Sequence, residues 1–284
     1  MIGRVLALRR AMDPIPGLSP PQPSWRLRGI GVCASTEWEL DRWLDQGRAE
    51  DPATGRLHAP RAVIARRQRF GHGQAGRAWE APAGGVWLSA ALPWPAQGPT
   101  AAVGLAVAVG LMLQLERLGL AARLKWPNDL ILSGRKLAGL LPGLRHRANQ
   151  VLWARVGLGL NGRNPVPAGA TNLRPSLGAW GAEPLRLTAM VLAALDWTMA
   201  AASQPELVRR QAECRLLLPV EPLWQQGEAW WPRGLASDGG LLLASGEKRR
   251  VLHREFPPHP ALASRSNHLA GSAAGGDVRP ADAC

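Results

Sequence analysis

Two segments of the chain combine residue types that could hold phosphate and carboxylate groups. From Gly71 to Arg77, three glycines let several backbone N–H groups turn toward one anion, and Arg69 adds positive charge nearby. From Lys125 to Asp129, a proline turn places an amide and a carboxylate beside basic residues, and Lys136 follows. Each segment alone is more often an ordinary turn, so the prediction of function depends on their occurring together.

Together these segments resemble the biotin protein ligase family, over roughly residues 26 to 256. QRFGHGQAGRAW (68–79) is similar to the glycine-arginine biotin loop of that family. KWPND (125–129) and KLAG (136–139) are similar to its central signature, and GLGLN (157–161) to the strand that follows. The segments also follow one another in the order and at the spacing typical of the family.

The resemblance implies an enzyme that forms biotinyl-5'-adenylate from biotin and ATP with Mg²⁺. It then transfers biotin to a lysine of the biotin carboxyl carrier protein of acetyl-CoA carboxylase. The implied catalytic residues are Lys136 and Arg77. The implied biotin-binding residues are Ser35, Thr36, Gln68, Gly71, His72, Gly73 and Lys136, and the implied nucleotide-binding residues are Trp79, Lys125, Asn128, Asp129 and Asn161, with Asp129 also helping to place Mg²⁺.

The chemistry is consistent with these residue types. A carboxylate and a triphosphate repel each other, so an enzyme that joins them needs cations and oriented N–H groups where charge develops. Lys136, Arg77 and Mg²⁺ would supply this stabilisation. No side-chain nucleophile is required, because the carboxylate attacks the α-phosphate and the acceptor amine attacks the resulting anhydride.

Three positions depart from the pattern of the family. Its Ser-Thr-Asn reads Ser35-Thr36-Glu37 here, and two inner arginines of its biotin loop are His72 and Gln74. Backbone contacts would survive these changes, but less side-chain charge would surround the adenylate. Arg69 is the nearby candidate to replace it.

Three alternatives remain at this point. A lipoate or octanoate ligase shares the implied architecture, although KWPND and GRAW favour biotin. A homologue that binds without catalysing is compatible with the altered loop. The net charge of +13 suggests nucleic-acid binding, but the short proline-rich segment before the first predicted strand leaves no room for a helix-turn-helix, so we expect no specific DNA partner.

Periodicity and turn signals predict the elements that position these residues. A long apolar helix is expected near the middle of the chain, and strands joined by tight turns should follow it. Ser35 and Thr36 are candidate N-caps, and Thr36/Glu39 and Ser203/Glu206 have capping-box spacing. Strands are expected at 26–32, 62–65 and 86–92, helices at about 36–44, 100–118, 186–202 and 205–217, hairpins from 123 to 161, and a β-rich segment from 218 to 256.

The implied fold class is α/β (α+β), with a mixed β-sheet catalytic domain of the biotin/lipoate ligase type. That domain should cover residues 26–217, and a small SH3-like β-barrel residues 218–256. Residues 1–25 form a proline-rich segment whose first part has no clear prediction, and residues 257–284 are expected to be a disordered tail.

The sequence says less about the cellular location of the protein and about its oligomeric state. The longest apolar run, Ala101 to Leu113, is too short to cross a membrane, and no signal-peptide apolar region is present. Three cysteines give neither the even count of a disulfide framework nor the spacing of a zinc site, which favours a reducing cytoplasm. A monomer and a homodimer both remain open.

Overall fold

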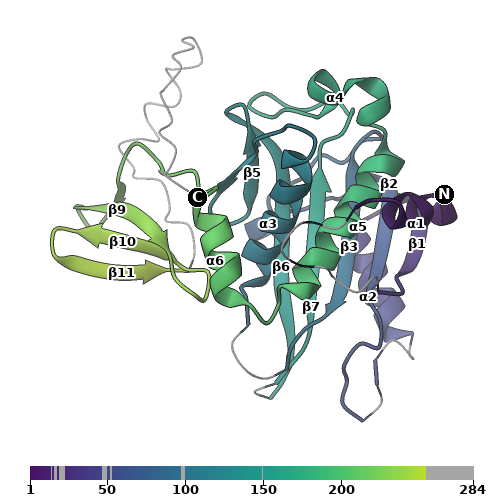
Figure 1. Ribbon diagram of the computed structural model, residues 1–284, viewed down its shortest axis with the longest axis horizontal. Helices are drawn as coiled ribbons and strands as arrows, with labels where there is room; N and C mark the ends of the chain where they lie inside the picture. Colours follow the sequence, from purple (N-terminus) through teal and green to yellow (C-terminus); the bar gives the residue numbers. More distant parts are fainter. Residues whose placement is uncertain are drawn as a thin grey trace.

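A seven-stranded mixed sheet forms the centre of the computed structural model, which describes residues 1–13, 15, 18, 23–46, 50–51, 53–96, 100–148 and 150–253 (Figure 1). The order of its strands is β1-β2-β3-β7-β6-β5-β4. β1 and β2 are parallel, and every other neighbouring pair is antiparallel. The predicted mixed sheet is therefore confirmed. The strands are β1 (Arg26–Cys33), β2 (Arg61–Gln68), β3 (Val86–Pro93), β4 (Arg123–Lys125), β5 (Asp129–Leu132), β6 (Arg135–Arg147) and β7 (Gln150–Leu160).

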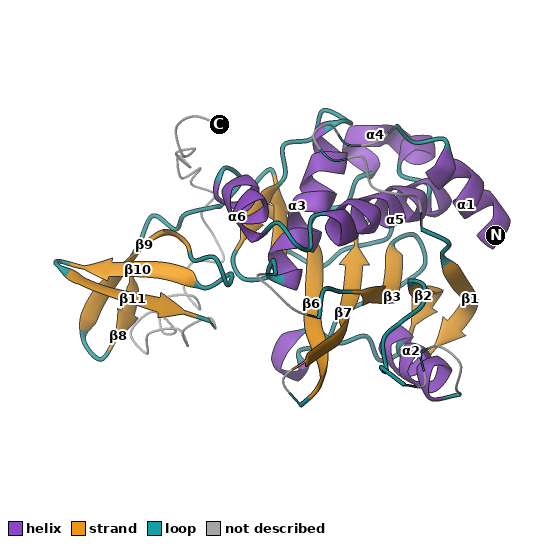
Figure 2. Cartoon of the chain, turned by 60° about the horizontal axis from the view of Figure 1, so that its bottom comes forward, coloured by secondary structure: helices purple, strands orange, loops and turns teal. Residues whose placement is uncertain are grey.

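Helices cover both faces of this sheet, as Figure 2 shows. α3 (Val103–Glu116) and α5 (Pro184–Ala200) lie on one face and pack against each other. Successive residues of a strand point to opposite faces, so Ala62 and Ile64 of β2 join the core under these helices, whereas Val63 joins a separate small core on the other face. That second core includes Leu40 of α2 (Thr36–Asp45).

The ends of two helices differ from the sequence prediction. Ser35 is the N-cap of α2 and its side chain accepts from the Glu37 N–H, so the Thr36/Glu39 capping box is wrong. α6 (Pro205–Glu213) begins after Gln204 without a side-chain cap, so the Ser203/Glu206 box is also wrong. In both cases the N-cap is the residue next to the expected one, Ser35 or Gln204, which breaks the spacing that a capping box requires.

The N-terminal residues form an element that the sequence left undetermined. α1 (Ile2–Arg10) packs against α5, and its Arg9 side chain is buried. The Arg9 Nε donates to Asp196 Oδ2, and Trp25 Nε1 donates to Asp196 Oδ1 at 2.8 Å. Burial raises the pKa of the Asp196 carboxyl, and the hydrogen bonds from Arg9 and Trp25 oppose that rise.

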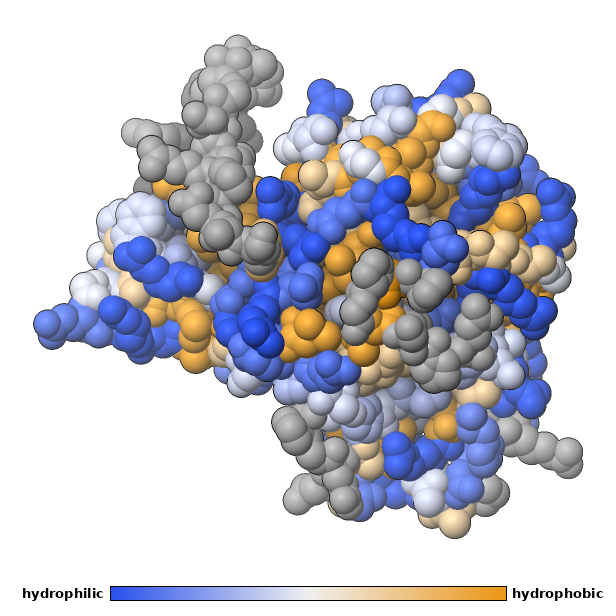
Figure 3. All heavy atoms as spheres, in the orientation of Figure 1, coloured by the Kyte–Doolittle hydropathy of each residue, from blue (hydrophilic) through white to orange (hydrophobic). Residues whose placement is uncertain are grey.

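A small antiparallel sheet follows α6, with strand order β11-β10-β9-β8. The expected small C-terminal β domain is therefore confirmed. Lys248, Arg249 and Arg250 are exposed on the edge strand β11, and hydrophilic atoms cover the outer end of this sheet in Figure 3. Charge on an edge strand discourages pairing with other chains. The strands are β8 (Leu223–Gln225), β9 (Glu228–Leu235), β10 (Leu241–Ser245) and β11 (Lys248–Leu252).

Several other features were absent from the prediction or cannot be compared with it. The short 3-10 helix η1 (Gln74–Gly76) and α4 (Arg174–Gly181) were not expected. Cys33 is a buried free thiol. Within the described ranges, no helix has the length and apolar character of a membrane span. The expected tail, 257–284, lies outside the described residues.

Candidate active site

One pocket opens between the sheet, the N-terminal end of α2 and the glycine loop, residues 69–79. The strands that line it, β2, β3, β5, β6 and β7, are separated in sequence but adjacent in the sheet. Most of the residues predicted for the site are brought together here. Those in the pocket wall are Ser35, Thr36, Gln68, His72, Gly73, Arg77, Trp79, Asn128, Asp129 and Lys136.

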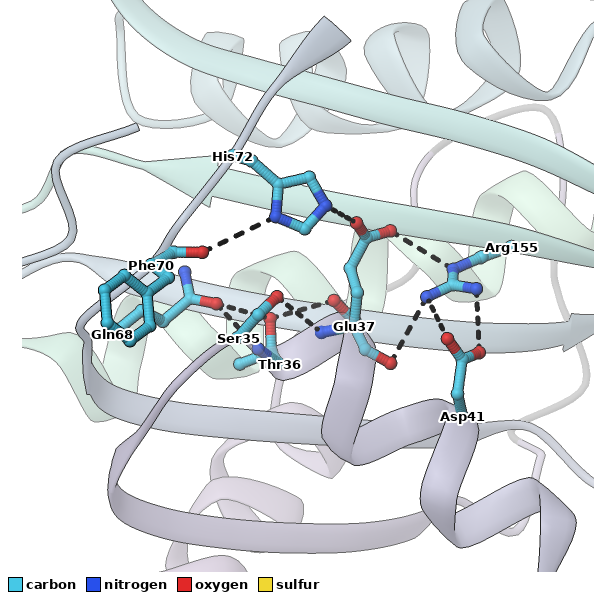
Figure 4. A network of polar contacts seen from close by, with 9 residues as sticks. Ser35, Thr36, Glu37, Asp41, Gln68, Phe70, His72 and Arg155 are labelled. Carbon is cyan, nitrogen blue, oxygen red and sulfur yellow. Dashed lines mark hydrogen bonds and ion pairs between the residues drawn. The ribbon is translucent and has the colours of Figure 1, made fainter. Parts of the chain in front are cut away.

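Polar side chains at the start of α2 form one end of the pocket (Figure 4). The Thr36 N–H donates to Gln68 Oε1 at 2.7 Å, and the Thr36 hydroxyl donates to the same oxygen at 3.0 Å. The amide of Gln68 is thereby fixed with its oxygen toward Thr36 and its N–H groups on the opposite side. The Ser89 hydroxyl lies 2.8 Å from Thr36 Oγ1 and completes the network. This end of the pocket therefore presents hydrogen-bond donors in a fixed arrangement.

Lys136 provides positive charge on the side formed by β6. Its Nζ lies 2.8 Å from Asp129 Oδ1 and 5.2 Å from the centroid of the Trp79 ring. The backbone of Lys136 is held on both sides, because its N–H donates to Gly169 O and its carbonyl accepts from the Thr171 N–H. The β5–β6 register shifts between Leu130 and Ile131, a bulge of the kind that re-aims side chains. The local structure thus directs this lysine into the pocket.

The indole of Trp79 lies directly against two glycines of the motif strands. A Cβ built at Gly139 would be 2.9 Å from the Trp79 ring, and one built at Gly159 would be 2.6 Å from it. Larger residues at either position would displace the indole. Trp79 Nε1 is buried and has no hydrogen-bond partner among the described residues. Gly139 of KLAG and Gly159 of GLGLN are therefore explained by the position of one aromatic side chain.

The glycine loop is held by its own backbone. The Trp79 N–H donates to Gly71 O at 2.9 Å, and the Gly73 N–H donates to Arg77 O at 2.8 Å. In this conformation the Gly73 N–H is used inside the loop rather than directed to an anion. Arg77 is exposed, and its Nε donates to Gln74 O.

Three predicted residues do not line this pocket. Gly71 lies in the neighbouring groove together with Arg69. Lys125 is exposed on β4, where it pairs with Asp129 through the backbone register. Asn161 is buried after β7, and its Oδ1 accepts from Asn164 Nδ2. Their predicted roles remain predictions.

Among the pocket residues that were not predicted as site residues, two bring polar groups to the α2 end of the pocket. Glu37 lines the pocket from the first turn of α2; its signal was the departure from Ser-Thr-Asn. Ser89 is fully buried in the otherwise apolar strand β3, and an isolated hydroxyl in such a strand was its only signal. Asn128 lines the pocket as expected, but its Nδ2 also donates to Leu140 O and so holds the KWPND turn against β6.

The structure offers a single carboxylate where a metal was expected. No group of three or more His, Cys, Asp or Glu side chains that could hold a metal occurs in the described part of the chain. Asp129 is paired with Lys136. Mg²⁺ is often bound by one carboxylate together with waters and substrate phosphates, and Asp129 fits only this kind of site.

The arrangement of strands and helices is that of the biotin protein ligase fold. The solved biotin protein ligase from Aquifex aeolicus in complex with biotin and ATP is similar, with a TM-score of 0.57, 21% identity, and coverage of 80% of this chain and 95% of that one. Residues 48–161 match the model of the Biotin/lipoate A/B protein ligase family. This match over residues 48–161 confirms the resemblance to biotin protein ligases that the motifs predicted.

Curated relatives agree over the same part of the chain. The Bifunctional ligase/repressor BirA of Escherichia coli (strain K12) is 40% identical over 112 residues, which cover 38% of this chain and 34% of that protein. The Biotin--[acetyl-CoA-carboxylase] ligase of Paracoccus denitrificans is 40% identical over 114 residues, 38% of this chain and 47% of that protein. The matches thus span about a third and about half of the length of these relatives.

Proposed function

We propose that this protein is a biotin protein ligase that uses ATP to form biotinyl-5'-adenylate and then biotinylates a lysine of a biotin carboxyl carrier protein. The observation that carries this proposal is the pocket itself, in which fixed donors at one end are combined with Lys136 on the β6 side. Names of the relatives support the same activity, since they include a biotin ligase and a protein in complex with biotin and ATP.

In the first step, the ring system of biotin would occupy the polar end of the pocket. The N–H groups of Gln68 and the hydroxyl of Ser35 are suited to a ureido carbonyl, which is a strong acceptor. The biotin carboxylate would then reach Lys136, whose charge offsets the repulsion between the carboxylate and the α-phosphate. A carboxylate oxygen attacks the α-phosphorus, and pyrophosphate leaves.

In the second step, the neutral amine of the acceptor lysine attacks the carbonyl carbon of the mixed anhydride. The C–N bond forms, the bond from that carbon to the phosphate oxygen breaks, and AMP leaves with the electron pair. The proton lost from the amine passes to solvent. Lys136 is positioned to stabilise the charge on the departing phosphate as well.

The remaining site residues are assigned to the binding of the nucleotide. We propose that Trp79, Asn128, Asn161, Lys125 and Arg77 contact ATP and that Asp129 contributes to a Mg²⁺ site. Bound Mg²⁺ would neutralise phosphate charge during adenylation. Asp129 would have to exchange its ion pair with Lys136 for the metal, which would leave Lys136 free to meet the substrate anions.

Exchange of labelled pyrophosphate into ATP tests the first step. We expect exchange with biotin and much less with lipoate or octanoate; equal or greater exchange with either acid would identify a lipoate-type ligase. Incubation with ATP, Mg²⁺, biotin and a biotin carboxyl carrier domain should then add the mass of one biotinyl group to that domain. Biotin binding without any exchange would identify a homologue that does not catalyse.

A further inference from the structure

Two of the positions at which the chain departs from the biotin-ligase pattern, Glu37 and His72, contact each other. Nε2 of His72 lies 2.7 Å from Glu37 Oε2, and the side chain of Glu37 is only 12% exposed. His72 Nδ1 faces the Phe70 carbonyl oxygen at 3.5 Å. Both ring nitrogens therefore face acceptors, and Figure 4 shows the ring between them. Relative to the family pattern, Glu37 introduces a carboxylate, and His72 introduces a ring N–H that can donate to it.

Glu37 is in turn fixed by a strand far away in the sequence. Arg155 of β7 donates from Nε to Glu37 Oε1 at 3.1 Å and from Nη2 to the Glu37 carbonyl at 3.2 Å. The same guanidinium binds both carboxylate oxygens of Asp41, at 2.7 and 3.1 Å. A Cβ built at Gly157 of β7 would lie 3.3 Å from Glu37 Oε1, so the absence of a side chain there leaves room for the carboxylate.

A partly buried carboxylate in this wall creates an electrostatic requirement. The proposed substrates are anions, and an unpaired negative charge at Glu37 would repel them. Arg155 supplies an opposite charge at one carboxylate oxygen, and the His72 ring lies within hydrogen-bond distance of the other. Hydrogen bonds to an ionised acceptor are stronger than neutral ones, so Glu37 can also fix the position of the loop that carries His72.

We propose that Glu37 is a positioning residue that holds the glycine loop over the pocket through His72, with Arg155 and Asp41 fixing its own orientation. This role rests on the proposed ligase function only where substrates are concerned. The contact itself joins α2, β7 and the loop in the protein without ligand. Its loss should open the loop, let ligands dissociate faster, and leave the Lys136 side of the pocket unchanged.

Amide hydrogen exchange of residues 71–79 in the protein without ligand tests the contact directly. We expect Glu37→Gln and His72→Gln each to increase loop exchange about tenfold, and the double variant to exchange no faster than either single variant, because both remove one interaction. His72→Lys, which places a different hydrogen-bond donor opposite Glu37, should keep the loop protected. Glu39→Gln is the matched control, since Glu39 lies on the same helix and pairs only with Arg42 among the ion pairs of the described residues.

Kinetics separate this positioning role from a general loss of structure. Glu37→Gln and His72→Gln should raise the KM for biotin about tenfold, with kcat changed less than threefold. Unchanged loop exchange in both single variants, or additive effects in the double variant, would overturn the proposal. His72 lies in a partly exposed loop, so His72→Gln keeps the test valid if a change at Glu37 impairs folding. If the variants lose amide protection in the loop but the protein shows no biotin-dependent exchange of pyrophosphate into ATP, the contact is supported and the ligase function is rejected.

Discussion

Lys136 shows how one side chain acquires a defined direction from its backbone. The bulge in β6 and the two backbone hydrogen bonds to residues 169 and 171 fix its main chain, while its side chain is 37% exposed and reaches Asp129. A residue with this exposure contributes little to the core. Its charge is therefore available for substrates without a structural role for the side chain.

Lys136→Ala should lower the rate of adenylate formation by two to three orders of magnitude. Removal of one preorganised charge costs roughly 3 to 4 kcal/mol, by analogy with oxyanion donors. Single-turnover adenylation measures this effect, and thermal unfolding should change little. Lys248→Ala is the control, because Lys248 also forms a 2.8 Å ion pair with a carboxylate but lies on β11. Near-normal adenylation by Lys136→Ala would remove it from the catalytic residues.

Gly159→Ala tests the contact between the strand and the Trp79 indole. The added methyl group would lie 2.6 Å from the ring, so the indole must move, and overpacking of this kind costs about 1 to 3 kcal/mol. We expect lower thermal stability and weaker ATP binding by calorimetry. Gly143→Ala is the control, because a Cβ there meets nothing within 4 Å. If Trp79→Leu in the Gly159→Ala background restores no stability, displacement of the indole is not the cause.

At the scale of elements, α1 combines apolar packing through Val5 with one buried ion pair. Arg9 reaches across to Asp196 in the middle of α5, and Trp25 donates to the same carboxylate from the residue before β1. The side chains of Arg9 and Asp196 are 4% and 7% exposed. Removing one partner of a buried pair leaves an uncompensated charge, which costs far more than the pair contributes.

Arg9→Ala should lower the free energy of unfolding by about 3 to 5 kcal/mol at neutral pH. Without Arg9, the pKa of Asp196, already raised by burial, should rise further. The ionised form is then disfavoured only in the folded state, so the loss of stability is greatest above the folded pKa and shrinks as pH falls through it. Denaturant titrations at several pH values measure this trend. Arg10→Ala, at an exposed neighbour, should have little effect, and a pH-independent loss would contradict the explanation.

At the scale of the whole molecule, the C-terminal sheet (β8–β11) contacts two segments of the part of the chain that contains the seven-stranded sheet and its helices. The Leu235 N–H donates to Glu213 Oε1 at 2.8 Å, and Trp126 Nε1 donates to Gly239 O at 2.9 Å. Trp126 belongs to the KWPND segment. The turn that carries Asn128 and Asp129 is thereby connected directly to the C-terminal sheet.

Glu213→Ala should loosen this attachment. It leaves the Leu235 N–H without its acceptor, at a cost of about 1 to 3 kcal/mol. We expect faster hydrogen exchange at Leu235 and a small decrease in the melting temperature, with residues of β3 unaffected. Glu206→Ala is the control, because Glu206 also pairs with Arg209 but is not bonded to β9 in any described contact. Unchanged exchange at Leu235 would show that the Glu213 contact is not needed to hold the sheet.

The sequence by itself determined the parts of this protein that depend on neighbours a few residues apart. Alternating and helical apolar patterns placed α2, α3, α5 and the hairpins, and the QRFGHGQAGRAW, KWPND and KLAG segments contain many of the residues that line the pocket. Helix caps were less predictable, because adjacent polar residues such as Ser35 and Thr36 compete for one position and only the backbone geometry selects between them.

The tertiary structure alone decided the contacts between distant residues. Trp79 meets Gly139 and Gly159 because β3, β7 and β6 are neighbours in the sheet, and no local pattern encodes that order. Asp196 is 187 residues from Arg9, so α1 carried no recognisable signal of where it would dock. Glu37 and His72 each looked like an isolated departure from a motif. Their pairing became visible only once the fold had placed the glycine loop beside α2.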